Sequence, residues 1–230
     1  MSQPIVVRAP ATSANLGSGF DCLGLALDLW NEVVAVPGGC SDGGNLVLRA
    51  ARAVFDEVGV PCPGFQLRQT DRVPSGRGLG SSAAAIACGV LLANHCLGGP
   101  LPASKLLEIG VRLEGHPDNL AACLLGGLQV ATTDAKGEVV TARVPLGLPL
   151  QAVCFVPQQR LLTTAARELL PLVVPIEDAM FNVARTGLLV AALATGQEHL
   201  LAEATRDRLH QPYRLPLFPA AAALIQAAMH

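Results

Sequence analysis

A glycine-rich turn that runs directly into an apolar, helix-forming segment is the feature that most constrains how this chain folds. Turn and helix start occupy residues 73–85, VPSGRGLGSSAAA. Glycine accepts positive φ and lets the backbone approach a ligand, and serine is a good N-cap. The residues concerned are Gly76, Gly78, Gly80, Ser81 and Ser82. Because the free N–H groups and positive dipole end of such a helix favour an anion, the turn predicts a phosphate site.

Two better-known phosphate motifs do not fit this turn, and a plain connecting turn is the alternative interpretation. The turn lacks the lysine of the P-loop pattern G-x-x-x-x-G-K-[ST], and its G-x-G-x-G differs from the G-x-G-x-x-G of dinucleotide folds. If the turn holds a nucleoside triphosphate, compensation of the phosphate charge must come largely from elsewhere. A Mg²⁺ ion held by a carboxylate is the expected source.

Composition indicates a folded protein that binds a small molecule. Of the 230 residues, 51% are hydrophobic and 15% charged, enough for a large core in one domain or two lobes. The formal charge of −2 excludes the basic surface that neutralises nucleic-acid phosphates. No apolar run reaches the ~20 residues of a membrane span, and the N-terminus lacks the apolar core of a secretory signal. We therefore expect a soluble, cytoplasmic protein with no nucleic-acid or membrane partner.

The cysteines predict no disulfide framework. Their number is odd, and none of them forms a CxxC pair. They are Cys22, Cys40, Cys62, Cys88, Cys96, Cys123 and Cys154. We expect them to be small core residues in a reducing compartment.

The order of expected elements predicts an α+β fold with a first lobe over residues 1–150 and a second over 151–230. Val-rich or alternating runs predict strands at 5–9, 32–36, 65–70, 128–133, 139–144 and 151–156. Helical spacing predicts helices at 46–58, 82–96, 104–113, 119–125, 163–170, 176–195, 198–208 and 220–230. Residues 11–21 are expected to form a loop. The helix at 82–96 is apolar on nearly all faces and should be buried.

The polar segment EGHPDN at residues 114–119 lies between two predicted helices. Ordinary capping explains it in one interpretation, with Asp118 or Asn119 as the N-cap and His116 in solvent. In the other, the Glu114 carboxylate completes a Mg²⁺ shell with a loop serine hydroxyl and triphosphate oxygens. Both interpretations stay open at this level.

Polar residues outside these segments also have two interpretations. Asn15 and Asp21 are turn residues in a glycine-rich connection, or contacts to a small substrate. Arg167 and Arg214 form surface ion pairs with neighbours such as Glu168 or Asp207, or they bind an anionic group, since a planar guanidinium suits a carboxylate. The isolated histidines are expected to be structural: His95, His199 and His210.

Three ordered motifs resemble the first segments of the GHMP kinase superfamily and, within it, the homoserine kinases. They are PATSANLGSGFDCLGLAL at residues 10–27, VPSGRGLGSSAAA, and EGHPDNLAACLLGG at 114–127. The later segments LTTAAREL and HQPYRLPLFP resemble the same family. The resemblance implies a two-lobed fold, with an N-terminal lobe like ribosomal protein S5 domain 2, a ferredoxin-like C-terminal lobe and a site between them. It also implies ATP- and Mg²⁺-dependent phosphorylation of L-homoserine in threonine biosynthesis, in a family that is often dimeric.

The resemblance implies roles for individual residues. The ATP phosphate loop would comprise Pro74, Ser75, Gly76, Arg77, Gly78, Leu79, Gly80, Ser81, Ser82, Ala83 and Ala84. Ser82 and Glu114 would bind Mg²⁺, with Ser81 as the alternative serine, and Thr163 would lie near the transferring phosphate. Asn15, Asp21, His116 and Asn119 would contact homoserine, and Arg167 with Arg214 would bind its carboxylate. Direct attack by the substrate hydroxyl needs no base, because a loose transition state depends on in-line positioning and charge stabilisation.

One family segment has no counterpart in the sequence: a second Gly- and Ser-rich stretch, expected beyond residue 230. Its absence predicts a truncated second lobe with an unpaired sheet edge and exposed apolar surface. Two alternative functions stay open, an isoprenoid-pathway kinase and a catalytically silent nucleotide-binding or dimerisation module. Arg167 and Arg214 favour a carboxylate-bearing substrate over a diphosphate or sugar.

Overall fold

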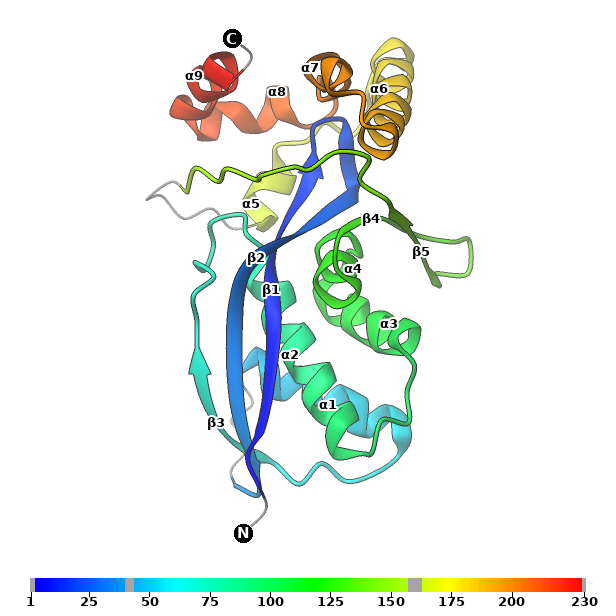
Figure 1. Cartoon of the computed structure of the whole chain (residues 1–230). Coiled ribbons are helices and arrows are strands. Elements are labelled where there is room, and N and C mark those ends of the chain that lie inside the picture. The colour runs from blue at the N-terminus through cyan, green and yellow to red at the C-terminus, as the bar shows by residue number, and fades with distance from the viewer. Residues whose placement is uncertain (1–2, 40–43, 157–162, 229–230) are drawn as a thin grey trace. The chain divides into compact units, whose positions relative to one another are not determined.

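Two long neighbouring strands, β1 (Ile5–Leu16) and β2 (Gly19–Pro37), dominate the first part of the chain in this computed structural model (Figure 1). The expected loop at 11–21 is wrong, because these residues extend both strands and leave only a tight turn. Gly17 lies in that turn at a φ of +54°, which glycine adopts without strain. The composition of the segment suggested a loop, but pairing with the neighbouring strand satisfies its backbone.

The structure describes residues 3–39, 44–156 and 163–228, except for the side chains of Thr163, Thr164, Pro219 and Ala228. They form two units, which we call the N-terminal unit and the C-terminal unit. The first comprises residues 1–14 and 21–143, and the second comprises residues 15–20 and 144–230. The tip of the β1–β2 hairpin therefore belongs to the C-terminal unit. The predicted lobe boundary at residue 150 stays a prediction.

The sheet is built around β2. Its later part pairs antiparallel with β3 (Phe65–Thr70), with Val34 opposite Arg68, and its earlier part pairs antiparallel with β4 (Leu128–Thr133), with Leu23 opposite Val130. The fifth strand, β5 (Val139–Val144), follows β4 in the order β1-β2-β4-β5. A strand of 19 residues is long enough to pair with two partners along its length.

Four helices cover one face of this sheet in the N-terminal unit (Figure 1). They are α1 (Leu46–Val58), α2 (Ser81–Cys96), α3 (Ala103–Glu114) and α4 (Asp118–Leu125). Their apolar faces pack on Ala9, Val33 and Ala35 of the sheet. As predicted, most of α2 is buried, because helices pack on it from more than one side. This core fixes the ends of α2, α3 and α4, where the polar candidates lie.

The C-terminal unit is mostly helical. Its elements are α5 (Thr163–Glu168), α6 (Ile176–Thr195), the 3-10 turn η1 (Glu198–Leu200), α7 (Leu201–Ala204), α8 (Gln211–Arg214), the 3-10 turn η2 (Leu215–Leu217) and α9 (Pro219–Ala228). The helix at 176–195 is confirmed. The strand expected at 151–156 is wrong, since these residues pair with no strand among the described residues, and Val153 and Phe155 are exposed. The helix expected at 198–208 is shorter than predicted, because η1 and α7 end at Ala204 and residues 205–210 are not helical.

The cysteines differ in how deeply they are buried. Cys88 and Cys123 are buried in the core, as expected, whereas Cys154 is exposed. Cys40 lies outside the described residues. Within the part of the chain that the structure describes, no helix combines the length and apolar character that a membrane span requires.

Candidate active site

The glycine loop has the backbone conformation of an anion-binding turn. Gly76, Gly78 and Gly80 have φ values of +67°, +75° and +66°. Gly80 is the N-cap of α2 and has no side chain that could cap the first turn. A serine N-cap is therefore wrong, because Ser81 is already helical. The absence of a capping side chain leaves the N–H groups of the first turn available to a phosphate.

An oxygen pair lies beside this first turn. The Ser82 hydroxyl, at the start of α2, donates to Glu114 Oε2 at the end of α3 over 2.6 Å. A hydroxyl and a carboxylate are oxygen ligands of the kind that Mg²⁺ prefers. No group of three or more His, Cys, Asp or Glu side chains among the described residues could hold a metal by itself. The donor set thus fits an ion that takes its other ligands from a nucleotide or from water.

The turn between α3 and α4 is organised by a buried carboxylate. Asp118 is 1% exposed, and its Oδ1 accepts from the Asn119 N–H at 2.7 Å and lies 2.9 Å from His116 Nδ1. Its Oδ2 is buried and has no hydrogen-bond partner among the described residues. A solvated His116 is wrong, because its side chain is only 17% exposed. Pro117, not Asp118 or Asn119, is the N-cap of α4.

Asn119 has a second contact that crosses the N-terminal unit. Its Oδ1 accepts from the Thr12 hydroxyl of β1 at 2.7 Å. Cys22 also lies in this region: burial, and after it the negative charges of Asp118 and Asp21, raise the pKa of its thiol. The turn at 116–119 and the first two strands therefore share one polar environment.

In the C-terminal unit, both predicted substrate arginines lie over one aromatic ring. The guanidinium carbons of Arg214 (α8) and Arg167 (α5) lie 4.8 and 5.9 Å from the ring centroid of Phe20 at the hairpin tip. The His210 ring stacks on Phe20 with the centroids 5.0 Å apart. Cation–π attraction and stacking place both guanidinium groups near one ring.

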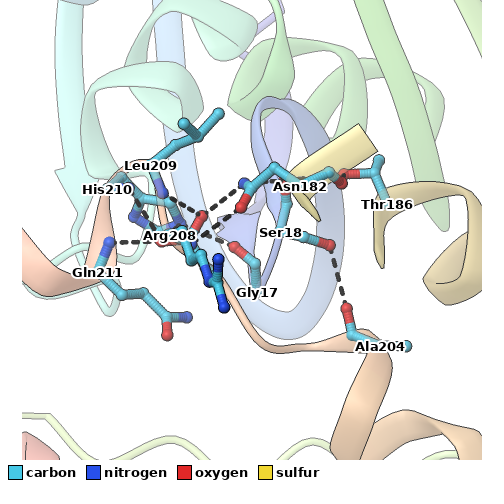
Figure 2. A network of polar contacts seen from close by, with 10 residues as sticks. Gly17, Ser18, Asn182, Thr186, Ala204, Arg208, Leu209, His210 and Gln211 are labelled. Carbon is cyan, nitrogen blue, oxygen red and sulfur yellow. Dashed lines mark hydrogen bonds and ion pairs between the residues drawn. The ribbon is translucent and has the colours of Figure 1, made fainter. Parts of the chain in front are cut away.

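A buried network ties the hairpin tip to the helices (Figure 2). The Ser18 carbonyl accepts from the Asn182 amide and the Thr186 hydroxyl, and the Ser18 hydroxyl donates to the Ala204 carbonyl. His210 Nε2 donates to the Gly17 carbonyl at 2.7 Å, so this nitrogen carries a proton. The hairpin tip that bears Phe20 is thus held by hydrogen bonds to α6, α7 and His210.

Asp207 is the acceptor at the centre of this network. Its side chain is fully buried, and it accepts from the Asn182 amide and from the backbone N–H groups of Leu209, His210 and Gln211. Burial alone would raise the pKa of this carboxyl. The hydrogen bonds from Asn182 and the backbone, with the nearby His210, outweigh burial and lower it.

Asn15, Asp21 and Thr163 are the remaining predicted site residues. Asn15 and Asp21 lie in the left-handed region, at φ values of +58° and +54°, on either side of the hairpin tip. Asparagine and aspartate tolerate this region better than other side chains, which agrees with the turn interpretation. Thr163 is the first residue of α5, and its side chain lies outside the described part of the chain. Their substrate roles stay predictions.

The candidate clusters contain residues that sequence patterns did not single out as functional. Thr12, Phe20, Asn182 and Asp207 had no spacing signal, because their partners lie far along the chain. The first family motif, at residues 10–27, contains Thr12 and Phe20 but implied no role for them.

Comparisons with known proteins identify the family. The family model of the GHMP kinases N terminal domain matches residues 45–127. The chain is 44% identical to a homoserine kinase of Moorella thermoacetica, over 97% of this chain and 80% of the relative. The chain belongs to the homoserine kinase family. A homoserine kinase of Caldicellulosiruptor bescii is 41% identical, over 94% of this chain and 74% of the relative.

The fold agrees with this family. A crystal structure of a homoserine kinase from Cytophaga hutchinsonii superposes with a TM-score of 0.85 at 27% identity, over all of this chain and 79% of that chain. The predicted resemblance and the α+β GHMP kinase fold are confirmed. The chain is a member of a phosphotransferase family and spans 74–80% of the length of these relatives.

Proposed function

We propose that this chain transfers the γ-phosphoryl group of ATP to the hydroxyl of L-homoserine, forming O-phospho-L-homoserine for threonine biosynthesis. The observation that supports this most directly is the match to homoserine kinases along 94–97% of the chain. The uncapped first turn of α2, with an oxygen pair beside it, supports the same chemistry independently.

On the ATP side, residues 74–84 bind the phosphates through backbone N–H groups of the glycine loop and of the first turn of α2. Ser82 and Glu114 hold Mg²⁺, with Ser81 as the alternative serine. When bound, Mg²⁺ would neutralise phosphate charge that this loop, with Arg77 and no lysine, leaves uncompensated. Thr163 lies near the transferring phosphate.

On the substrate side, Arg167 and Arg214 bind the homoserine carboxylate, and Phe20 keeps their guanidinium groups together. Asn15, Asp21, His116 and Asn119 contact the rest of the amino acid. The substrate hydroxyl attacks directly, because phosphoryl transfer through a loose transition state depends on positioning more than on early deprotonation. We further expect a cytoplasmic protein that forms a homodimer. Light scattering of the purified protein would test the oligomeric state.

A coupled assay of ADP release tests the reaction with homoserine, with mevalonate and without acceptor. We expect turnover with homoserine alone. Turnover with mevalonate would instead support an isoprenoid-pathway kinase, and ATP binding without turnover would support a silent nucleotide-binding module.

The variant Arg214→Ala tests the carboxylate site. Losing a charge-assisted hydrogen bond should raise the homoserine KM by about 10- to 100-fold and leave the ATP KM nearly unchanged. Arg208→Ala is the matched control, because Arg208 contacts Asp178 at 3.1 Å and the Phe181 ring at 4.1 Å instead of Phe20. An equal loss for both substrates in Arg214→Ala would contradict the assignment.

A further inference from the structure

Thr12 has a hydroxyl in a place where polar groups are costly unless paired. It lies in β1, its side chain is 0% exposed, and its hydroxyl donates to Asn119 Oδ1 at 2.7 Å. A buried hydroxyl without a partner destabilises a fold by a few kcal/mol, so this bond holds both side chains in place. The contact spans 107 positions of the chain.

The bond fixes which way the Asn119 amide faces. Its oxygen accepts from Thr12, and its nitrogen lies 3.5 Å from the carboxylate oxygen Oδ1 of Asp118. A carboxylate attracts an amide NH₂ group and repels an amide oxygen, so both neighbours favour the same orientation. One of the two amide N–H groups lies toward Asp118, and the other is the donor that Asn119 can offer to a ligand.

Thr12 also contacts the glycine loop. Its backbone N–H donates to the Leu79 carbonyl at 3.1 Å. A Cβ on Gly80 would lie 1.9 Å from Thr12 Oγ1 and 3.2 Å from Asn119 Oδ1. Only glycine fits there, so the N-cap of α2 lies directly against the Thr12–Asn119 pair. One threonine therefore touches both the phosphate loop and the turn at 116–119.

We propose that Thr12 is a positioning residue that holds Asn119 as a hydrogen-bond donor to the homoserine hydroxyl oxygen, in register with the phosphate loop. This inference rests on the proposed function, in which Asn119 contacts homoserine. The hydroxyl oxygen accepts from Asn119 and forms a bond to the γ-phosphorus. The bond from that phosphorus to the bridging oxygen breaks with its electron pair on ADP, and the hydroxyl proton passes to a phosphoryl oxygen.

Kinetics of Thr12 variants test this role. Thr12→Val removes the hydroxyl, and Thr12→Ser is the matched control that keeps it. We expect Thr12→Val to lower kcat/KM for homoserine by about tenfold, the value of one hydrogen bond, with ATP affinity within about twofold. Thr12→Ser should stay near the wild type. Wild-type kinetics in Thr12→Val, or equal losses in both variants, would overturn the proposal.

A double-mutant cycle separates positioning from general destabilisation. If Thr12 acts through Asn119, adding Thr12→Val to Asn119→Ala should lower kcat/KM for homoserine by less than about twofold beyond the loss in Asn119→Ala alone. Independent, multiplied losses would contradict the assignment. Thr12→Ala serves as the hydroxyl-free variant if Thr12→Val does not fold.

A readout that needs no turnover keeps this inference separate from the proposed function. The side-chain amide signals of Asn119, assigned by their loss in Asn119→Ala, should shift in Thr12→Val and stay in place in Thr12→Ser by ¹H–¹⁵N NMR. Unchanged signals in Thr12→Val would overturn the inference. A wild-type chain that phosphorylates no homoserine would overturn the proposed function while these spectra still report the Thr12 contact.

Discussion

The two units hold their candidate residues by different means. In the N-terminal unit, the polar groups lie at the ends of helices packed in a large apolar core, with Ile86, Leu92 and Leu120 fully buried. In the C-terminal unit, a buried polar network of Ser18, Asn182 and Asp207 holds the hairpin tip, while apolar side chains along α6 stay exposed. These exposed side chains are Ile176, Met180 and Val183.

This difference predicts different sensitivities. Apolar packing tolerates replacement by groups of similar volume, whereas a buried network fails when one partner is removed, because the others are left unsatisfied. Substitutions at the N-terminal candidates should therefore impair chemistry in a folded protein. Substitutions in the network should loosen the C-terminal unit first.

The largest effect is expected for Glu114→Gln in the N-terminal unit. Loss of the carboxylate charge should lower kcat/KM by about 100-fold and raise the Mg²⁺ concentration needed for activity, with stability nearly unchanged. Glu108→Gln is the control on the same helix, since Glu108 pairs with Lys105 at 3.3 Å. Steady-state kinetics over a Mg²⁺ titration decide the point. Equal activities of the two variants would remove Glu114 from the site.

Asn182→Ala should destabilise the C-terminal unit and leave the stability of the N-terminal unit nearly unchanged. It removes one hydrogen-bond donor from the Ser18 carbonyl and one from the Asp207 carboxylate, and it removes the acceptor of the Arg208 N–H, which should destabilise the C-terminal unit by about 2–3 kcal/mol. Hydrogen exchange should accelerate in α6 and at residues 15–20, but not in α2. The control is Asn94→Ala. Asn94 is less buried, and its side-chain amide bonds the backbone N–H and carbonyl of Leu101. Uniform acceleration across both units would contradict the comparison.

Acid should act on the C-terminal unit through Asp207. Its pKa is lower in the folded chain than in the unfolded chain, so its contribution to stability is present above the ordinary value of about 3.9 and is lost as pH falls through the lowered value. Urea unfolding at pH 7, 5 and 3.5 should show a steeper decline for the wild type than for Asp207→Asn. Parallel declines would show that Asp207 does not contribute.

The smallest effect concerns thiol reactivity. Burial, helped by the Asp71 charge, raises the pKa of Cys88 to about 12, and burial raises the pKa of Cys123. A disulfide reagent at pH 8 should therefore modify exposed Cys154 quickly and reach Cys88 and Cys123 only on unfolding. Cys154→Ser should remove a fast phase that Cys88→Ser retains. Fast labelling of Cys88 would show that the core opens readily.

Local patterns predicted the elements that depend on local chemistry. The helix at 176–195 and the strand at 65–70 match the structure, and their spacing and flanking turn residues predicted them. The predictions of a loop at 11–21 and of a strand at 151–156 were wrong for the same reason. Whether a segment is a strand depends on a partner elsewhere in the chain, which local composition does not reveal.

The candidate site was partly predictable in the same sense. The order of three motifs identified the family, and it pointed to Ser82 and Glu114, whose side chains are hydrogen-bonded in the structure. It did not reveal that Thr12 is hydrogen-bonded to Asn119, or that two arginines lie near the Phe20 ring.

The sequence by itself therefore determined most of the helices, the glycine loop and the family, because hydrophobic spacing, glycine conformation and motif order are properties of neighbouring residues. Only the tertiary structure decided which buried hydroxyl, amide and aromatic ring lie together. The physical reason is that a buried polar group must find a partner wherever packing brings one, and that partner is often far away along the chain.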